Sequence, residues 1–420
     1  MNLINLAWKN IWRNKVRSGV ILTAIALGLF SGTFMLSFMQ GWIMGTVNDD
    51  IKSQYSHIQI HHADFLANND INAYFDRNAV AEKLEHGCRG EACLALAQHL
   101  TPTSIAYRLN LTGMLASAHN AIGVTAKGVF ADEEIQVTDV WQHIPDTMGN
   151  FFDNDLRMAV VISSRTADKL RVRLRSRIVF TFQDVNGDMQ SLAFRVGGIY
   201  RTTNAMFDES HVFVRYDDIF PYTGLPEGAV HESAILLPDI ETSNTVLPQL
   251  QSLFPDMSVR DWSEMNPALA MYFSYTDFMG LVILGIFLFA LSFGIINTML
   301  MAVLERTREL GMLGAIGMSK RKIFSMIMLE TVFLTLLGSA VGIILGIAVI
   351  LPTLQSGIDL SFFMEDQFED FGFASIVYPI LNVRMFVEIV VLVILAGILS
   401  AIYPARKALK LKPLDAIKQS

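Results

Sequence analysis

The chain has 420 residues, of which 52% are hydrophobic and 17% are charged, and its formal net charge is −8. A soluble globular chain usually has about 25% charged residues. This composition, with a mean hydropathy of +0.39, therefore excludes an ordinary soluble domain and indicates an integral membrane protein with a sizeable soluble part. Lys and Arg concentrate in three short segments, 9–17, 306–322 and 406–418. The positive-inside rule places those segments in the cytoplasm, and no extended basic tract remains for nucleic acid.

The amino-terminal region predicts a cytoplasmic segment over 1–19 and a first membrane span over 20–44. About 20 apolar residues cross the hydrocarbon core, so this run is long enough to span and we expect an uncleaved anchor. Gly28 and Gly32 form a small-residue stripe suited to close helix packing. An aromatic stripe follows the same helix, and it indicates bulk that faces lipid or packs against neighbouring helices. Its members are Phe30, Phe34, Phe38 and Trp42.

The segment 45–270 has the composition of a soluble domain, and the charge rule places it outside the cytoplasm. Apolar residues alternate with polar ones in several short runs, which predicts strands, and the Asn186-Gly187 pair between two such runs predicts a hairpin turn. Ser163 or Ser164 is expected to cap a helix that runs to about Leu170. Strands and helices mix along the segment, so its expected class is α+β. The predicted strands are Ile58–Ile60, Leu109–Val129 as a meander, Ala159–Ile162, Ile178–Phe182, Leu192–Ile199, Val212–Val214 and Ala234–Leu237, and the other predicted helices are Val80–Leu84, Ala92–His99 and Thr242–Phe254.

Two sets of residues in this domain could suggest special chemistry. Cys88 and Cys93 are the only cysteines, and an even pair in an oxidising compartment favours a disulfide over two free thiols or a metal site. His57, His61 and His62 could suggest a metal site, but an exposed strand face is the better interpretation because neither a carboxylate nor a cysteine is close in the sequence. We therefore expect neither a metal site nor a catalytic site.

The remaining segment, 271–420, predicts three further membrane spans at about 277–303, 325–352 and 385–402. A second small-residue stripe in the middle span predicts close helix packing. An aromatic and acidic outer loop is expected over 353–382, and a basic cytoplasmic tail over 403–420. Glu330 lies within a span and near its cytoplasmic end, where an interfacial role is favoured over substrate contact. The second stripe consists of Gly338, Gly342 and Gly346.

The segment 304–323 is short, charged and helix-prone, and it connects two spans on the cytoplasmic side. It could be a solvated loop, or a short amphipathic helix offered to a soluble partner. In the second interpretation, apolar anchors and a few directional charges would form the interface, and glycines would allow a close approach. The residues expected to act there are Glu305, Arg306, Arg308, Glu309, Leu310, Gly311, Leu313 and Gly314.

Three motifs in this order resemble the FtsX-like permeases of ABC transporters. They are Trp8-Lys9-Asn10 with Arg13, the run Glu305–Gly311 with Ala315-Ile316-Gly317, and Tyr403–Ala408 with Pro413–Ile417. The resemblance implies a four-helix permease fold in which 304–323 is the coupling helix that docks on an ATPase. Val160-Val161-Ile162 and Val196–Ile199 resemble landmarks of a MacB-type extracytoplasmic core domain inserted between helices 1 and 2. Arg171–Arg177 replaces the Gly-Asp turn usual in that domain. The resemblance also implies that the aromatic stripe of the first span lines a lateral opening for acyl chains.

The chain contains no Gly-Lys dipeptide, so a Walker A loop is excluded and we expect ATP and Mg²⁺ to bind a partner subunit. Within the family the chain is most similar to the LolC/LolE lipoprotein-releasing subunits. The resemblance implies a non-enzymatic subunit in a bacterial inner membrane, with an ATPase dimer, a second permease chain, lipid and a lipoprotein as partners. Alternatives are export of a peptide or hydrophobic compound, transmission of movement to a cell-wall enzyme, and a membrane-anchored sensor that transports nothing.

Overall fold

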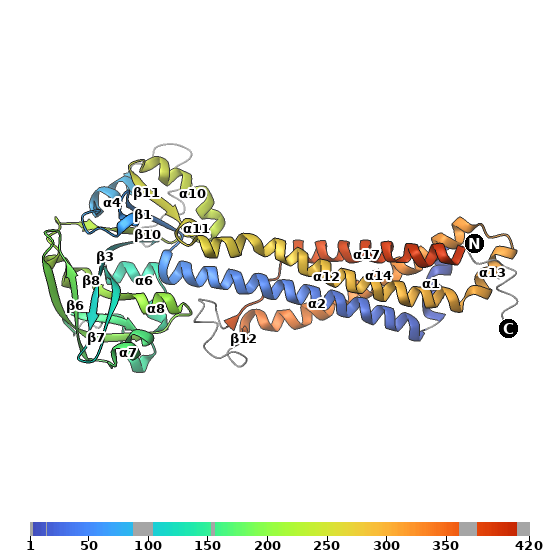
Figure 1. Cartoon of the computed structure of the whole chain (residues 1–420). Helices are drawn as coiled ribbons and strands as arrows, with labels where there is room; N and C mark the ends of the chain where they lie inside the picture. Colours follow the sequence, from blue (N-terminus) through green and yellow to red (C-terminus); the bar gives the residue numbers. More distant parts are fainter. Residues whose placement is uncertain (1–2, 14, 87–103, 153–155, 361–375, 410–420) are drawn as a thin grey trace. The chain divides into compact units, whose positions relative to one another are not determined.

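The computed structural model describes residues 3–13, 15–86, 104–152, 156–360 and 376–409, and it separates into two compact units. The helical unit contains 1–43, 274–359 and 376–420, and the sheet unit contains 44–273. Figure 1 labels their elements, and the two units are described separately below.

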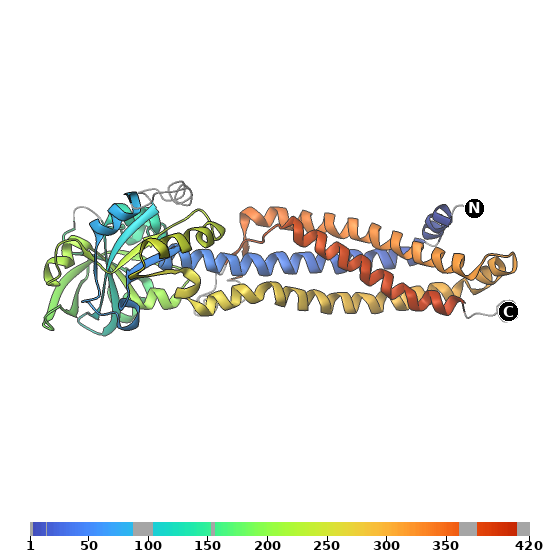
Figure 2. The ribbon, with the colours of Figure 1, turned by 90° about the horizontal axis from the view of Figure 1, so that it is seen from above.

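The helical unit is built from long helices that run alongside one another (Figures 1 and 2). Among the described residues, four helices are long and apolar enough to cross a membrane, as judged by length and composition, and this number agrees with the four predicted spans. A short ladder also pairs β12 (Ile358–Asp359) with β13 (Ile376–Val377). The helices are α1 (Leu3–Arg13), α2 (Lys15–Asp50), α12 (Pro267–Glu305), α13 (Thr307–Ala315), α14 (Lys320–Ser356) and α17 (Val383–Leu409).

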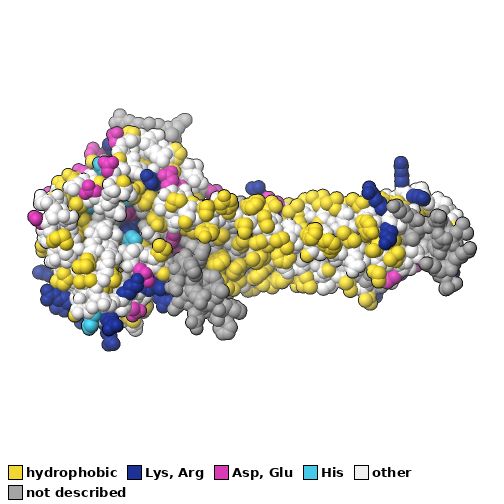
Figure 3. Space-filling view, viewed as in Figure 1, with side chains coloured by type: hydrophobic (Ala, Val, Ile, Leu, Met, Phe, Trp, Pro, Cys, Tyr) yellow, Lys and Arg dark blue, Asp and Glu magenta, His cyan; other side chains and the backbone are white. Residues whose placement is uncertain are grey.

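Each long helix extends beyond the apolar run that predicted it. The run 20–44 lies inside α2, which begins at Lys15 and ends at Asp50. Hydrophobicity marks only the residues suited to lipid, whereas a helix continues while its residues can form backbone hydrogen bonds. Hydrophobic side chains cover the visible face of the long helices, and Lys and Arg gather at the end that carries α13 (Figure 3).

The sheet unit is organised around a nine-stranded mixed sheet in the order β11-β1-β10-β3-β4-β8-β5-β7-β6, and β2 pairs with β9 in a separate ladder. Most neighbours are antiparallel, but β4–β8 and β5–β7 are parallel. The strands are β1 (Ile58–His62), β2 (Phe75–Asp76), β3 (Ile105–Ala116), β4 (Ala121–Val129), β5 (Ala159–Ser163), β6 (Arg177–Gln183), β7 (Met189–Tyr200), β8 (His211–Arg215), β9 (Ala229–Val230), β10 (Glu232–Ile235) and β11 (Met257–Asp261).

Part of this sheet closes on itself because β3 is long enough to pair with two strands, β10 and β6, along the same edge. Its first residues, Ile105–Arg108, pair with β10, and its last, Gly113–Ala116, pair with β6. Strands β3, β4, β8, β5, β7 and β6 therefore form a closed ring. Gly113 lies at the closure, where an added Cβ would approach the Thr181 carbonyl oxygen and lie 2.8 Å from the Phe180 ring. A larger residue would push these two strands apart.

Short helices cover the sheet, and several local predictions are confirmed. Asn186-Gly187 lies in the β6–β7 turn, with Gly187 at φ +88°. The Ser163 hydroxyl accepts from the Thr166 amide at 3.1 Å and so caps α7. Residues 92–99 lie outside the described residues. The helices are η1 (Ile51–Tyr55), α3 (Phe65–Asn68), α4 (Arg77–His86), α6 (Ala131–Val137), η3 (Val140–His143), η4 (Asp146–Met148), α7 (Ser164–Leu170), α8 (Ala205–Ser210), α9 (Tyr216–Ile219), η5 (Phe220–Tyr222), α10 (Ile240–Leu253) and α11 (Trp262–Met265).

The exposed position expected for His57, His61 and His62 is wrong for two of the three. His57 and His61 are 6% and 2% exposed, because β1 lies between β10 and β11 instead of at an edge. His57 Nδ1 accepts from the Leu237 amide at 3.0 Å, and His61 Nδ1 lies 2.9 Å from the His231 carbonyl oxygen. Among the described residues, no group of three or more His, Cys, Asp or Glu side chains could hold a metal ion.

Candidate functional site

The segment between the second and third long helices contains one short helix, α13. Helix α12 ends at Glu305, α13 covers Thr307–Ala315, and α14 begins at Lys320. The Leu310 amide donates to the Arg306 carbonyl oxygen at 2.9 Å, so the backbone turns into α13 directly after α12. Gly317, at φ +96°, allows the turn after α13 that an L-residue would resist. The sequence at this point therefore forms a helix–break–helix connection.

Arg306, at the α12–α13 break, points inward and pairs with Glu330 of α14. Its Nη1 atom lies 3.2 Å from both carboxylate oxygens. The Glu330 side chain is 4% exposed and the Arg306 side chain 14% exposed. The position of Arg306 differs from the outward-facing role expected from the sequence, because a buried carboxylate one helix away requires a cation. The Glu330 carboxylate is thus buried in an ion pair within the helical unit, and the interfacial role favoured for it stays a prediction.

Glu309 connects α13 to the amino-terminal helix. Its Oε2 atom pairs with the Arg13 guanidinium of α1 and lies 3.4 Å from Arg306 Nε. The hydrogen bond from Arg13 is the main reason why the pKa of Glu309 is lowered. Helix α1 packs in turn on α14, where the Trp8 and Phe333 ring centroids are 5.6 Å apart. Arg13, Glu309, Arg306 and Glu330 thus form one charged chain across α1, α13 and α14, called the base cluster below.

The outward face of this segment differs from the face expected from the sequence. Leu310 is 9% exposed and packs in the helix core, and the half-buried Leu313 packs against the same core. They were expected to anchor a partner, and that expectation is wrong for Leu310. The large apolar side chains that do face outward are Met312, 48% exposed, and Ile316, 85% exposed. Their spacing of four residues was the available signal, but it was hidden by the leucines, which have a similar period.

The other predicted residues of this segment lie around that face. Glu305 is the last residue of α12 and is exposed, and Arg308 is exposed in the first turn of α13. Gly311 is half-buried in α13, and Gly314 also lies in α13. The structure thus separates an inward set with Arg306 and Leu310, which holds α13 in place, from an outward set around Arg308.

Both glycine stripes lie at helix–helix contacts of α2. An added Cβ would lie 2.7 Å from Ile25 Cγ2 at Gly338, 2.7 Å from the Ala26 carbonyl oxygen at Gly342, and 2.9 Å from Thr33 Oγ1 at Gly346. On the other side of α2, Gly28 and Gly32 face Leu291 and Leu284 of α12, at 3.4 and 3.6 Å. The structure adds Gly397 of α17, whose hydrogen faces Thr335 of α14. Gly397 has no partner glycine four residues away, so the spacing rule did not reveal it.

The aromatic stripe of α2 is continuous and half-buried. Ring centroids are 6.1 Å apart for Phe30 and Phe34, 6.2 Å for Phe34 and Phe38, and 6.3 Å for Phe38 and Trp42. Cys88 and Cys93, and residues 361–375 of the predicted outer loop, lie outside the described residues.

Comparison with known proteins identifies the family to which this arrangement belongs. Residues 281–413 match the family described as FtsX-like permease C-terminal. The macrolide export ATP-binding/permease protein MacB of Chlorobaculum tepidum is 32% identical over 125 residues, 30% of this chain and 16% of that protein. MacB of Neisseria gonorrhoeae is 28% identical over 292 residues, 64% of this chain and 40% of that protein. Residues 281–413 therefore carry an FtsX-like permease C-terminal domain.

The chain spans two fifths or less of the length of those two relatives. The periplasmic region of MacB from Actinobacillus actinomycetemcomitans is a similar solved structure, with a TM-score of 0.33 and 10% identity, covering 53% of this chain and 97% of that one. The family match contains α13, Arg306 and Glu330, whereas Arg13 and α1 lie outside it.

Proposed function

We propose that this FtsX-like permease is the membrane subunit of an ABC transporter and receives force from a separate cytoplasmic ATPase through α13. The observation that carries the proposal is the base cluster. A short helix between two membrane-capable helices is held by ion pairs to a third helix as well, so a push on α13 acts on α1 and α14 together. A plain connecting loop would not need such bracing.

The outward face of α13 and of Ile316, which follows it directly, has the composition of a docking site. Interfaces combine buried apolar anchors with a few directional charges, and Arg and Met are enriched in them. Met312 and Ile316 provide the apolar anchors, and the exposed Arg308 provides the charge. The proposed partner is an ATPase dimer that binds ATP and Mg²⁺ and works with two permease chains in a bacterial inner membrane, the sheet unit being on the periplasmic side.

The substrate we propose is a lipoprotein that is released from the membrane. The half-buried aromatic stripe of α2 supports a substrate with acyl chains, because large planar side chains offer apolar contact at low conformational cost. Export of a peptide or hydrophobic compound, movement of a cell-wall enzyme, and ligand sensing without transport are the other outcomes of the tests below.

Docking can be tested by co-purification of the ATPase with Ile316→Asp and Met312→Asp. A buried charge at one central position commonly costs an interface about 2 kcal/mol or more, so we expect at least about thirtyfold weaker capture. Met206→Asp is the matched control, since Met206 is 76% exposed but belongs to the sheet unit. Parent-like capture by both α13 variants would remove the docking assignment.

The substrate can be tested by ATP hydrolysis of the purified complex. We expect an acylated lipoprotein to stimulate hydrolysis and the same polypeptide without its acyl chains to have little effect. Equal stimulation by both would favour peptide export. Stimulation by a cell-wall enzyme alone would favour transmission of movement, and failure of any ATPase to bind the parent chain would favour the sensor.

A further inference from the structure

The sheet unit has a polar band on one face, where a hydrophobic core would be expected. Strand register places His61 opposite Glu232, and Glu232 opposite Arg108. Further along the same face, Asn110 is opposite Lys127. Because side chains alternate between the two faces of a sheet, these residues from four neighbouring strands project to the same side. Buried polar groups at this density require hydrogen-bond or ionic partners.

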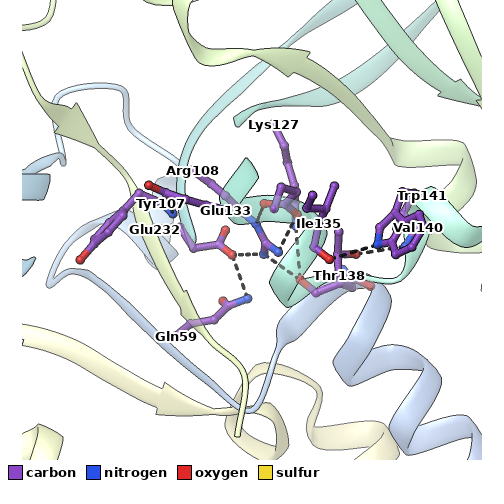
Figure 4. A network of polar contacts seen from close by, with 12 residues as sticks. Gln59, Tyr107, Arg108, Lys127, Glu133, Ile135, Thr138, Val140, Trp141 and Glu232 are labelled. Atoms are coloured by element: carbon purple, nitrogen blue, oxygen red, sulfur yellow. Dashed lines mark hydrogen bonds and ion pairs between the residues drawn. The ribbon is translucent and has the colours of Figure 1, made fainter. Parts of the chain in front are cut away.

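Most charges in the band are paired with one another (Figure 4). The Arg108 guanidinium donates to both carboxylate oxygens of Glu134, at 2.8 and 2.9 Å, and to Glu232 Oε1 at 2.5 Å. Glu232 Oε2 accepts from Asn110 Nδ2 at 2.6 Å. Burial opposes ionisation of Glu232, but Lys127 and Arg108 outweigh it and lower its pKa. Arg108 and its two carboxylates therefore form a satisfied triad.

Lys127 is less well satisfied than this triad. The ammonium group has three donors and the residue is 4% exposed, yet its hydrogen bond among the described residues is one of 3.3 Å to the Gln54 carbonyl oxygen. Burial lowers its pKa to about 8. Next to it, Asn110 Oδ1 is buried and has no hydrogen-bond partner in the described part of the chain. The Lys127 ammonium can therefore donate to a further hydrogen-bond acceptor, and Asn110 Oδ1 can accept from a further donor.

Lys127 and Asn110 are among the residues that line a cavity of about 150 Å³. Thr112, Thr125 and His211 add polar groups to its wall, and Leu66 of α3 lies at its edge. A water molecule occupies about 30 Å³ of liquid, so the cavity holds about five waters or a solute of a few heavy atoms. Pockets for drug-sized ligands begin at about 300 Å³, so the cavity suits a smaller ligand.

We propose that this cavity binds a small α-amino acid in its zwitterionic form. The carboxylate would accept from the Lys127 ammonium, and the amino group would donate to Asn110 Oδ1. The two residues are directly opposite on adjacent strands, about 5 Å apart at Cβ, and an amino acid carries its two charged groups on one carbon. Arg108 and Lys127 balance Glu134 and Glu232 in charge, so a ligand without net charge is favoured over an anion.

Calorimetric titration of the purified full chain tests this proposal without any ATPase. We expect glycine and alanine to give saturable heat, and acetate, which lacks the amino group, and glycinamide, which lacks the carboxylate, to bind at least about tenfold more weakly. Lys127→Met should weaken glycine binding by at least the same factor. Lys169→Met is the control, because Lys169 is an exposed lysine paired with Glu209 at 2.7 Å.

Leu66→Trp provides a second variant that keeps every polar group of the band and fills the cavity edge. It should abolish glycine binding while circular dichroism shows a folded sheet unit, and it decides the question if Lys127→Met does not fold. The proposal is overturned if glycine gives no saturable heat in the parent, which would leave a cavity filled by water. Equal binding of acetate or glycinamide, or parent-like binding by the folded variants, would also overturn it.

Discussion

The buried charged triad of the sheet unit and the base cluster of the helical unit differ in how far they are exposed to solvent. In the sheet unit, the Arg108 and Glu134 side chains are 1% and 0% exposed. In the base cluster, Arg13 and Glu309 are 55% and 45% exposed, and only the Arg306–Glu330 end is buried. A buried pair is costly to break, whereas an exposed pair contributes little to stability and can exchange partners with water. The first cluster therefore fixes a shape, and the second can change without unfolding the protein.

Removing one member of the buried triad should cause the largest loss of stability and is the strongest test of this difference. Glu134→Gln leaves the fully buried Arg108 with one carboxylate in place of two, and we expect it to destabilise the sheet unit by about 3–5 kcal/mol. Urea unfolding monitored by proteolysis of this unit measures the effect. Glu209→Gln, which breaks the exposed pair with Lys169, should cost about 0–1 kcal/mol. Similar costs for the two variants would refute the distinction.

The buried end of the base cluster should give a smaller effect. Arg306→Met removes the cation that faces Glu330, and we expect a loss of about 1.5–3 kcal/mol in the helical unit, the usual range for a hydrogen bond to a charged group. Unfolding of the purified chain in sodium dodecyl sulfate measures this loss. Adding Glu330→Met should recover most of it, because the carboxylate left behind is then absent. A double variant less stable than Arg306→Met would contradict this account.

Acid should lower the stability of the sheet unit more than that of the helical unit, because all nine histidines lie between residues 57 and 231. Burial lowers the pKa of His57 to about 4 and that of His211 to about 3. Below pH 6.5 the unfolded chain binds protons that the folded sheet unit does not. Its unfolding free energy is therefore at its highest above pH 6.5 and falls toward pH 4, by up to about 1.4 kcal/mol per pH unit for each such histidine.

Unfolding curves of the sheet unit between pH 7 and pH 4 check this prediction. His57→Gln should flatten the curve, since the glutamine oxygen can still accept from the Leu237 amide but does not titrate in this range. His62→Gln is the matched control, because His62 is only half-buried and lies at the end of β1, five residues after His57. An unchanged slope in His57→Gln would show that other groups cause the acid sensitivity.

The exposed end of the base cluster should give the smallest change in stability. Arg13→Gln should cost less than about 1 kcal/mol, and the effect should shrink further at high salt. Its effect on function should be larger than on stability, because it removes the connection between α1 and α13. Substrate-stimulated ATP hydrolysis, measured beside unfolding in the same detergent, checks both statements. Normal stimulation in Arg13→Gln would show that α1 does not share the movement of α13.

The sequence predicted features that depend on local pattern and missed those that depend on distant partners. Four apolar runs marked four long helices, and Asn186-Gly187 marked a hairpin, because length and turn chemistry act within a few residues. The burial of His61 depends on which strands flank β1, and that pairing joins residues 170 positions apart. Nothing in the amino-acid pattern around His61 could show it.

The candidate site shows the same limit. A short helix at α13 could be predicted from its composition, but the direction of Arg306 depends on Glu330, which belongs to another helix. Likewise, Leu310 and Ile316 are both apolar, and only the packing of α14 decides that one is buried and the other exposed. The glycine stripes were easier to interpret, because a four-residue period itself indicates a helix face.

The Arg13–Glu309 pair has a consequence for the order in which the protein is made. The two residues are 296 positions apart, and a ribosome that adds roughly 5–20 residues per second needs roughly 15–60 s to pass from one to the other. During that interval α1, α2 and the whole sheet unit have left the ribosome. A nascent chain stalled before residue 309 would therefore display α1 without its ionic partner, and a quality-control protease could distinguish it from the finished protein.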